Sequence, residues 1–190
     1  MVELYSLDRF VDGIETLLKK TVKDLGAARG SLMAVDHREK VLKIKVATSL
    51  NPSGALHREI IEKTRTKVGD GVAGMVAKTG KPLLINDIEE LKKAFPRLRT
   101  STDAGSYESS LVVPIKDEGS VIAVLNISDK KDGGKFTEED LHSAELLGEY
   151  CAVAIKLERQ NKGVLLVNEI IREISLTNSL HDIYKLVTSK

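Results

Sequence analysis

Apolar residues recur at three- and four-residue steps at both ends of the chain. The first repeat predicts an amphipathic helix over residues 4–25, ending at Gly26. The second follows Thr137, a helix-capping residue with Asp140 three positions on, and continues to about residue 174. A helix of about 30 residues is longer than a small domain needs to cover a sheet. We therefore expect its distal half to pack against another helix, most simply that of a second copy.

Between these helices the pattern changes to alternating or continuous apolar runs, which are typical of strands. Turn-like polar residues join the first two runs and also the last two, and each pair therefore predicts a β-hairpin. The predicted strands cover residues 29–36, 41–48, 82–87, 108–117 and 120–129.

A glycine-rich block, GDGVAGMVAKTGKPLLIND, occupies residues 69–87. It predicts a helix of about two turns that Asp70 caps and that ends at Gly80, because Pro82 prevents its continuation. The block lacks the GK[ST] sequence of a phosphate-binding loop, so we interpret its glycines as turn and packing residues.

Residues 88–108 combine a short charged helix with a polar stretch that has no periodic signal. Long irregular segments in compact domains are usually functional. This segment is therefore the best binding candidate that the pattern offers.

The ordered set of motifs resembles a GAF domain over about residues 5–160. The resemblance is carried by the glycine-rich block, then SSLVVPI, VIAVLNISDK and FTEEDL, followed by the long helix. It implies an α+β, PAS-like fold with an antiparallel sheet of five or six strands. The terminal helices are expected on one face of the sheet, and a ligand pocket under a capping loop on the other.

Many cyclic-nucleotide-binding members of that family carry a dispersed Asn-Lys-Phe-Asp-Glu pattern. Here Lys130, Phe136 and Asp140 match, but Asp129 and Leu141 replace the Asn and the Glu. We interpret a Lys130–Asp140 pair as a clamp between a loop and a helix rather than as a nucleotide contact.

The candidate pocket residues are polar side chains near the ends of the predicted strands and in the polar stretch. Arginines there pair well with anionic ligands, and hydroxyls provide hydrogen bonds. The alternative is that Asp87 caps the short helix and the hydroxyls serve turns. The set is Ser31, Asn86, Asp87, Arg97, Arg99, Tyr107, Ser109 and Ser110.

Composition excludes several classes of partner. With 29 Lys and Arg against 28 Asp and Glu, and 4% aromatic residues, the chain has no general basis for binding nucleic acid or a charged membrane. No apolar run approaches the length of about 20 residues that spans a bilayer. The N-terminus does not read as a signal peptide, so we expect a cytoplasmic protein.

The sequence offers no catalytic constellation and no metal-ligand spacing, so we expect neither an enzyme nor a metal site. The four histidines, at positions 37, 57, 142 and 181, are interpreted as surface residues. Cys151 is the one cysteine, and its helical position indicates a buried structural thiol. The GAF resemblance implies that a covalently attached bilin would need a cysteine in the pocket region, and because no cysteine lies in residues 82–116, bilin attachment is not expected. The free methionine sulfoxide reductases share the GAF fold, but their activity rests on several cysteines. The identity of any other cofactor is left open.

The resemblance implies a small-molecule sensor that transmits ligand state through its terminal helices to an output domain in the same protein. The alternative is a ligand-free dimerisation module. We expect a GAF domain over residues 1–160, a signalling helix over 161–178 and the start of a following domain over 179–190. A homodimer is expected through Leu157, Val164 and Ile171.

Overall fold

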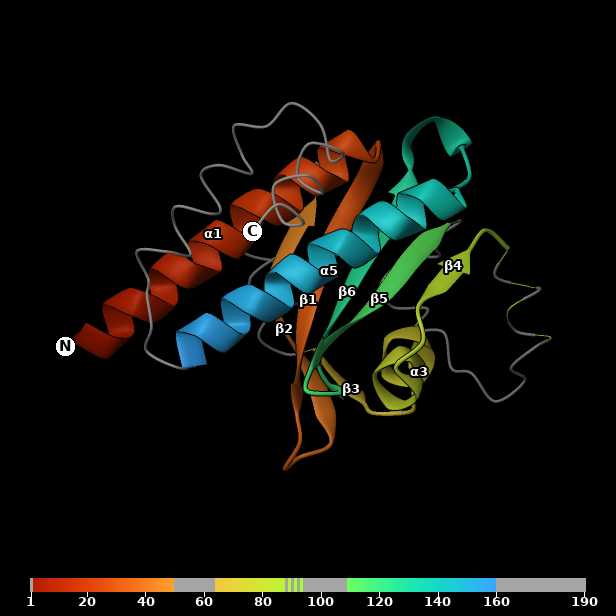
Figure 1. Cartoon of the computed structure of the whole chain (residues 1–190). Coiled ribbons are helices and arrows are strands. Elements are labelled where there is room, and N and C mark those ends of the chain that lie inside the picture. The colour runs from red at the N-terminus through yellow and green to blue at the C-terminus, as the bar shows by residue number, and fades with distance from the viewer. Residues whose placement is uncertain are drawn as a thin grey trace.

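The computed structural model describes residues 2–49, 64–87, 89, 91, 93 and 109–159, which form one sheet with helices on both faces (Figure 1). The elements are α1 (Val2–Asp24), β1 (Ala27–Asp36), β2 (Val41–Ser49), β3 (Arg65–Lys67), α3 (Gly71–Thr79), β4 (Leu83–Ile85), β5 (Ser110–Asp117), β6 (Ser120–Lys130), a 3₁₀ turn η2 (Lys131–Gly133) and α5 (Glu138–Arg159).

The six strands lie in the order β3-β2-β1-β6-β5-β4, and every neighbouring pair is antiparallel. Both predicted hairpins, β1–β2 and β5–β6, are confirmed. The centre of the sheet joins distant parts of the chain, because β1 pairs with β6 and Ser31 lies opposite Asn126. The expected α+β, PAS-like arrangement is therefore the observed one.

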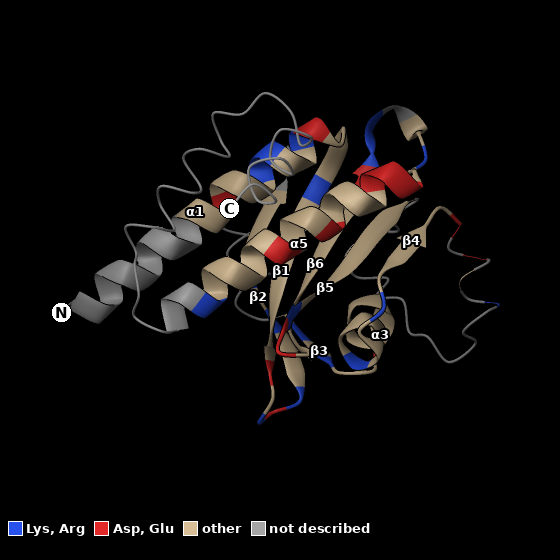
Figure 2. Cartoon of the chain, in the orientation of Figure 1, with Lys and Arg blue, Asp and Glu red and all other residues tan. Residues whose placement is uncertain are grey.

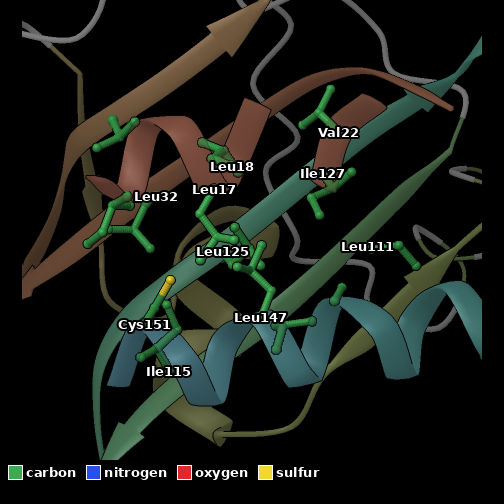
Figure 3. Packing of buried hydrophobic residues seen from close by; sticks show 14 of the residues in the cluster. Leu17, Leu18, Val22, Leu32, Leu111, Ile115, Leu125, Ile127, Leu147 and Cys151 are labelled. Carbon is green, nitrogen blue, oxygen red and sulfur yellow. The ribbon is translucent and has the colours of Figure 1, made fainter. Parts of the chain in front are cut away.

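Helices α1 and α5 cover one face of the sheet, as Figure 1 shows. Strand residues that alternate toward this face pack with the apolar sides of both helices into a single buried cluster (Figure 3). The cluster includes Leu18 and Val22 of α1, Leu125 of β6, and Leu147 and Cys151 of α5. The repeats that predicted the two helices are therefore the residues that bury them.

Helix α3 lies against the opposite face, where it forms a second buried cluster with the sheet. Val72 and Val76 of α3 pack there with Met33, Val112 and Val124 of the central strands. The helix ends at Gly80 in the left-handed conformation (φ 64°), as predicted. We expected Asp70 to cap α3 with its side chain. It occupies the N-cap position, but its side chain makes no capping hydrogen bond, so that expectation was wrong in its mechanism.

Gly74 allows α3 to pack closely against the turn that precedes it. A Cβ at this position would lie 2.3 Å from the carbonyl oxygen of Lys67, so only glycine lets α3 approach the turn that precedes it. The carbonyl of Gly74 also accepts the N–H of Gly69, at 2.7 Å. The block packs a helix against a turn, in agreement with the structural interpretation of its glycines.

Strand β3 was not predicted. Its three residues, Arg65, Thr66 and Lys67, are all polar, and they pair along one side with β2. An edge strand that is this short and this polar has no alternation to detect. The expected continuation of α5 beyond residue 159 lies outside the described residues.

Candidate functional site

The α3 face of the sheet is apolar in one half and polar in the other. Ser31 of β1 lies directly opposite Asn126 of β6, and both alternate with residues of the α1–α5 cluster. Two positions further along each strand, toward α3, Met33 and Val124 belong to the apolar cluster. The polar side chains therefore begin where α3 stops covering the sheet.

Ser110 extends this polar half onto β5. Its hydroxyl donates to Oδ1 of Asn126 at 2.6 Å and lies 3.3 Å from the carbonyl oxygen of Ile127. It is completely buried. Ser128 of β6, 7% exposed, lies opposite Ser110 in the strand register. We call Ser31, Ser110, Asn126 and Ser128 the polar row.

The polar row offers hydroxyl and amide groups, which donate and accept hydrogen bonds without carrying charge. Among the described residues, Arg29 is a charged group beside the polar row, opposite Ser128 in the register, and its guanidinium binds the carboxylate of Asp129. That ion pair neutralises both groups. The described side chains of this surface can therefore donate and accept hydrogen bonds while carrying no net charge.

Asp129 has a left-handed backbone, with φ 60°. Asparagine and aspartate tolerate this conformation better than other residues with a side chain. Aspartate therefore suits the backbone conformation that the fold requires at position 129.

Lys130 and Asp140 form the clamp that the sequence predicted, with Nζ 2.5 Å from Oδ2. Asp140 also accepts the N–H of Thr137 at 2.9 Å, and the Thr137 hydroxyl accepts the N–H of Asp140, which completes the capping box of α5. Figure 2 shows the basic end of β6 and η2 beside the acidic first turn of α5. Burial raises the pKa of Asp140, but Lys130 and Thr137 outweigh that effect and lower it. This motif joins two elements of the fold.

Asn86 lies just after β4 and is bound to the loop before α5. Its Nδ2 donates to the carbonyl oxygen of Phe136 at 2.8 Å, and its Oδ1 accepts the N–H of Phe136 at 2.9 Å. Both ends of the amide are thus used by one backbone residue. The structure places this candidate at the junction with α5.

Asp87 and Ser109 lie on either side of the segment 88–108. The carboxylate of Asp87 accepts the N–H of Glu89 at 2.8 Å, which is the capping role given as the alternative for this residue. The hydroxyl of Ser109 accepts the N–H of Lys130 at 3.2 Å, and its carbonyl accepts the N–H of Asp129. A ligand-binding role for either residue stays a prediction.

Six further candidates fall partly or wholly outside the described part of the chain. Arg97, Arg99, Tyr107, Val164 and Ile171 lie outside it altogether. Leu157 lies within α5, where the structure describes its backbone alone.

Cys151 points into the α1–α5 cluster, on the opposite side of the sheet from the polar row. It is 2% exposed, and burial raises the pKa of its thiol to about 12. Figure 3 shows its sulfur among the leucine and isoleucine side chains of the cluster. The structural interpretation of this thiol is confirmed, and His37 and His142 are exposed as expected.

Asn126, Ser128 and Arg29 were missing from the candidates. A signal existed for the first two, because the alternation in VLNIS places Asn126 and Ser128 on the face opposite to Leu125 and Ile127. Arg29 carried no such signal, since its partner is 100 residues away. Within the described residues, no group of His, Cys, Asp and Glu is arranged to hold a metal, and no helix is long and apolar enough to cross a membrane.

Several solved structures share the fold. The GAF domain of a phosphoenolpyruvate-protein phosphotransferase from Coxiella burnetii is 20% identical, with a TM-score of 0.64, over 84% of this chain and 95% of that one. A free methionine-R-sulfoxide reductase from Neisseria meningitidis is 20% identical, with a TM-score of 0.62, over 80% of this chain and 81% of that one. At these identities the likeness shows the fold alone.

A curated relative is the dual 3',5'-cyclic-AMP and -GMP phosphodiesterase 11 of Drosophila melanogaster, 28% identical over 155 residues. The match covers 75% of this chain but 11% of that enzyme, so the chain spans about a tenth of its length. A family model described as GAF domain matches residues 11–156, from within α1 almost to the end of α5. On this match, which agrees with the strand order and the motifs, the chain belongs to the GAF domain family.

Proposed function

We propose that this chain is a sensory domain that binds a small molecule on the α3 face and transmits its occupancy through α1 and α5 to an output domain. GAF domains are regulatory sensory modules in signalling proteins. The observation that carries the proposal is the polar row, in which hydroxyl and amide groups from β1, β6 and β5 share one face beside an apolar cluster. Binding sites for small molecules commonly combine an apolar lining with a few placed polar groups.

The proposed signalling route follows from the placement of the helices. α1 and α5 pack on the opposite face of the same strands that carry the polar row. A ligand shifts the packing of these helices only if it binds one arrangement better than the other. We propose that the domain works in the cytoplasm, where Cys151 stays a buried free thiol.

A thermal-shift screen with cyclic nucleotides, 2-oxo acids, amino acids and haem tests this proposal. A ligand at about 100 times its dissociation constant adds about 2.7 kcal/mol to the free energy of unfolding. Asn126→Ala and Ser31→Ala should weaken the affinity for any compound that stabilises the protein. Ser143→Ala is the matched control, because it removes a hydroxyl whose described hydrogen bond goes to the carbonyl oxygen of Glu139 in the same helix, on the outer side of the fold. Equal affinity in all variants would refute the polar row as the binding site.

A second candidate function, dimerisation without a ligand, is favoured by the surface of α5. Val153 is 52% exposed. Together with Leu146 and Tyr150 it follows the heptad spacing that continues to Leu157 and on to Val164 and Ile171. We propose that this stripe pairs with its copy in a homodimer. Val164→Asp combined with Ile171→Asp should give a monomer in light scattering, and an unaltered dimer would show that another surface is used.

We do not extend the activity of the methionine sulfoxide reductases to this chain. Its single cysteine, Cys151, lies on the face of the sheet covered by α1 and α5, whereas the polar row lies on the other face. The raised pKa of the Cys151 thiol leaves almost no thiolate at neutral pH. The outcome of the ligand screen decides between the sensor and the dimerisation module.

A further inference from the structure

We infer that Asn86 is a positioning residue, which couples the start of the segment 88–108 to the first turn of α5. In the proposed sensor, this coupling is a physical connection between the ligand side and the signalling helix α5. Its role in signalling rests on the proposed function, whereas the coupling itself requires no ligand.

Two hydrogen bonds attach the side chain of Asn86 to the backbone of Phe136. Its amide donates to the carbonyl of Phe136 at 2.8 Å and accepts the N–H of the same residue at 2.9 Å, across 50 positions of sequence. Two hydrogen bonds to one backbone residue fix both the distance and the orientation of the two segments. A displacement of Asn86 therefore either carries Phe136 along or breaks both bonds.

On the β4 side of Asn86, the contacts of the neighbouring residues extend to the α3 face of the sheet. Asp87 follows Asn86 directly and binds the N–H of Glu89, while its carbonyl accepts the N–H of Leu91 at 3.2 Å. Leu91 packs against the α3 cluster, as does Ile85. The residues around Asn86 are thus held by the apolar half of the face that carries the polar row.

The other side of the connection leads to α5. Phe136 is 2% exposed and belongs to the α1–α5 cluster. The next residue, Thr137, caps α5, and its carbonyl accepts the N–H of Leu141 at 3.0 Å. Asn86 therefore links a residue packed on one face of the sheet to the helix that covers the other face.

Ser109 supplies a second attachment at the far end of the same segment, but it ends on β6. Its hydroxyl and carbonyl accept the N–H groups of Lys130 and Asp129. From Lys130 the path reaches α5 only through the side-chain ion pair with Asp140. Among the described contacts, Asn86 is the more direct connection, because it binds the backbone that enters α5.

The test is a double-mutant cycle read by residue-resolved amide hydrogen exchange in the 190-residue chain without added ligand. Asp87→Ala removes the acceptor of Glu89 and loosens the start of the segment. With Asn86 present, it should speed the exchange of the Phe136 and Leu141 amides about tenfold. In the Asn86→Ala background, the same Asp87→Ala change should leave the exchange of Leu141 unaltered.

Ile122→Val is the matched control background, since it destabilises the buried core at the other end of β6 and leaves the junction intact. There the Asp87→Ala effect should remain about tenfold. If Asn86→Ala does not fold, Asn86→Asp replaces it, because it keeps the acceptor for the Phe136 N–H and removes the donor. In that background, Asp87→Ala should accelerate amide exchange less than it does in the native background. An acceleration that is the same in all backgrounds, or that is absent in the native one, would overturn the inference.

The two proposals fail separately. If the exchange experiment shows no coupling and the screen finds a ligand, Asn86 is not part of the signalling route, but the proposed sensory function stands. An intact coupling in a chain that binds none of the compounds would leave the connection as a mechanical property of the fold.

Discussion

Lys130 and Asp140 form an ion pair across the junction of β6 and α5, and the same Asp140 oxygen accepts the N–H of Thr137. One carboxylate thereby fastens the last strand to the capping box of the helix that follows it. The described contacts of Lys130 and Asp140 thus hold elements of the fold together.

Asp140→Asn should lower the free energy of unfolding by about 1 kcal/mol at pH 7, as is typical of a partly exposed ion pair. The pKa of Asp140 is lower in the folded state than the ordinary 3.8. The contribution of Asp140 to the free energy of unfolding is therefore complete above pH 3.8 and is lost as the pH falls through the folded-state pKa. Urea unfolding between pH 7 and pH 3 should show the wild type losing its advantage in the acid range. Parallel curves for the two proteins would contradict this assignment.

The left-handed backbone of Asp129 makes a prediction about substitutions there. Asp129→Asn keeps a residue type that tolerates φ 60°, whereas Asp129→Val places a β-branched side chain in that conformation. Asp129→Val should cost about 1–2 kcal/mol more than Asp129→Asn in chemical denaturation. Both variants remove the charge that pairs with Arg29, so the difference reports the backbone conformation together with the hydrogen bond that asparagine can still accept. Equal losses would mean that the ion pair dominates at this position.

Gly74→Ala should destabilise the protein by about 1–3 kcal/mol, because the new Cβ would lie 2.3 Å from the carbonyl oxygen of Lys67. Gly134→Ala is the matched control. Gly134 has φ −71°, and a Cβ there would meet nothing closer than 3.6 Å. Its substitution should be neutral or slightly stabilising. Thermal denaturation of the two variants measures the contrast, and similar melting temperatures would refute the packing role of Gly74.

Cys151 should be unreactive in the folded protein. Burial raises the pKa of its thiol to about 12, so a thiol reagent at pH 8 should modify it at a rate set by unfolding. The measurement compares the rate in buffer with the rate in urea. Cys151→Ala should cost about 1–2 kcal/mol, and Cys151→Ser more, since the hydroxyl would enter an apolar cluster. Rapid labelling of the native protein would contradict the burial.

Local signals in the sequence predicted most of the fold. The hairpin turn before Ser120, the left-handed Gly80 and the capping box of Thr137 and Asp140 depend on residues within a few positions of one another. The order of motifs then identified the family. Strand β3 escaped detection because it is short and polar, and its place is set by pairing with β2.

The candidate site was less accessible to sequence reasoning, because its contacts join remote positions. Asn86 was proposed as a pocket residue, but its bonds to Phe136 depend on where two loops meet in space. Ser110 is among the candidates that the sequence suggests, whereas its hydrogen-bond acceptor Asn126 is not. A polar residue after a strand signals a site or a cap equally well, and only the fold distinguishes them.

The pairing of β1 with β6 has a consequence for how the domain forms. Ala27 lies opposite Lys130, and Ala34 lies opposite Ala123, so the central ladder closes a loop of roughly a hundred residues. A chain emerging from the ribosome can form the first hairpin early, but it cannot complete the middle of its sheet until β6 has been synthesised. Contacts of such long range slow folding. Until then, the inner edge of β1 stays open to pairing with other chains.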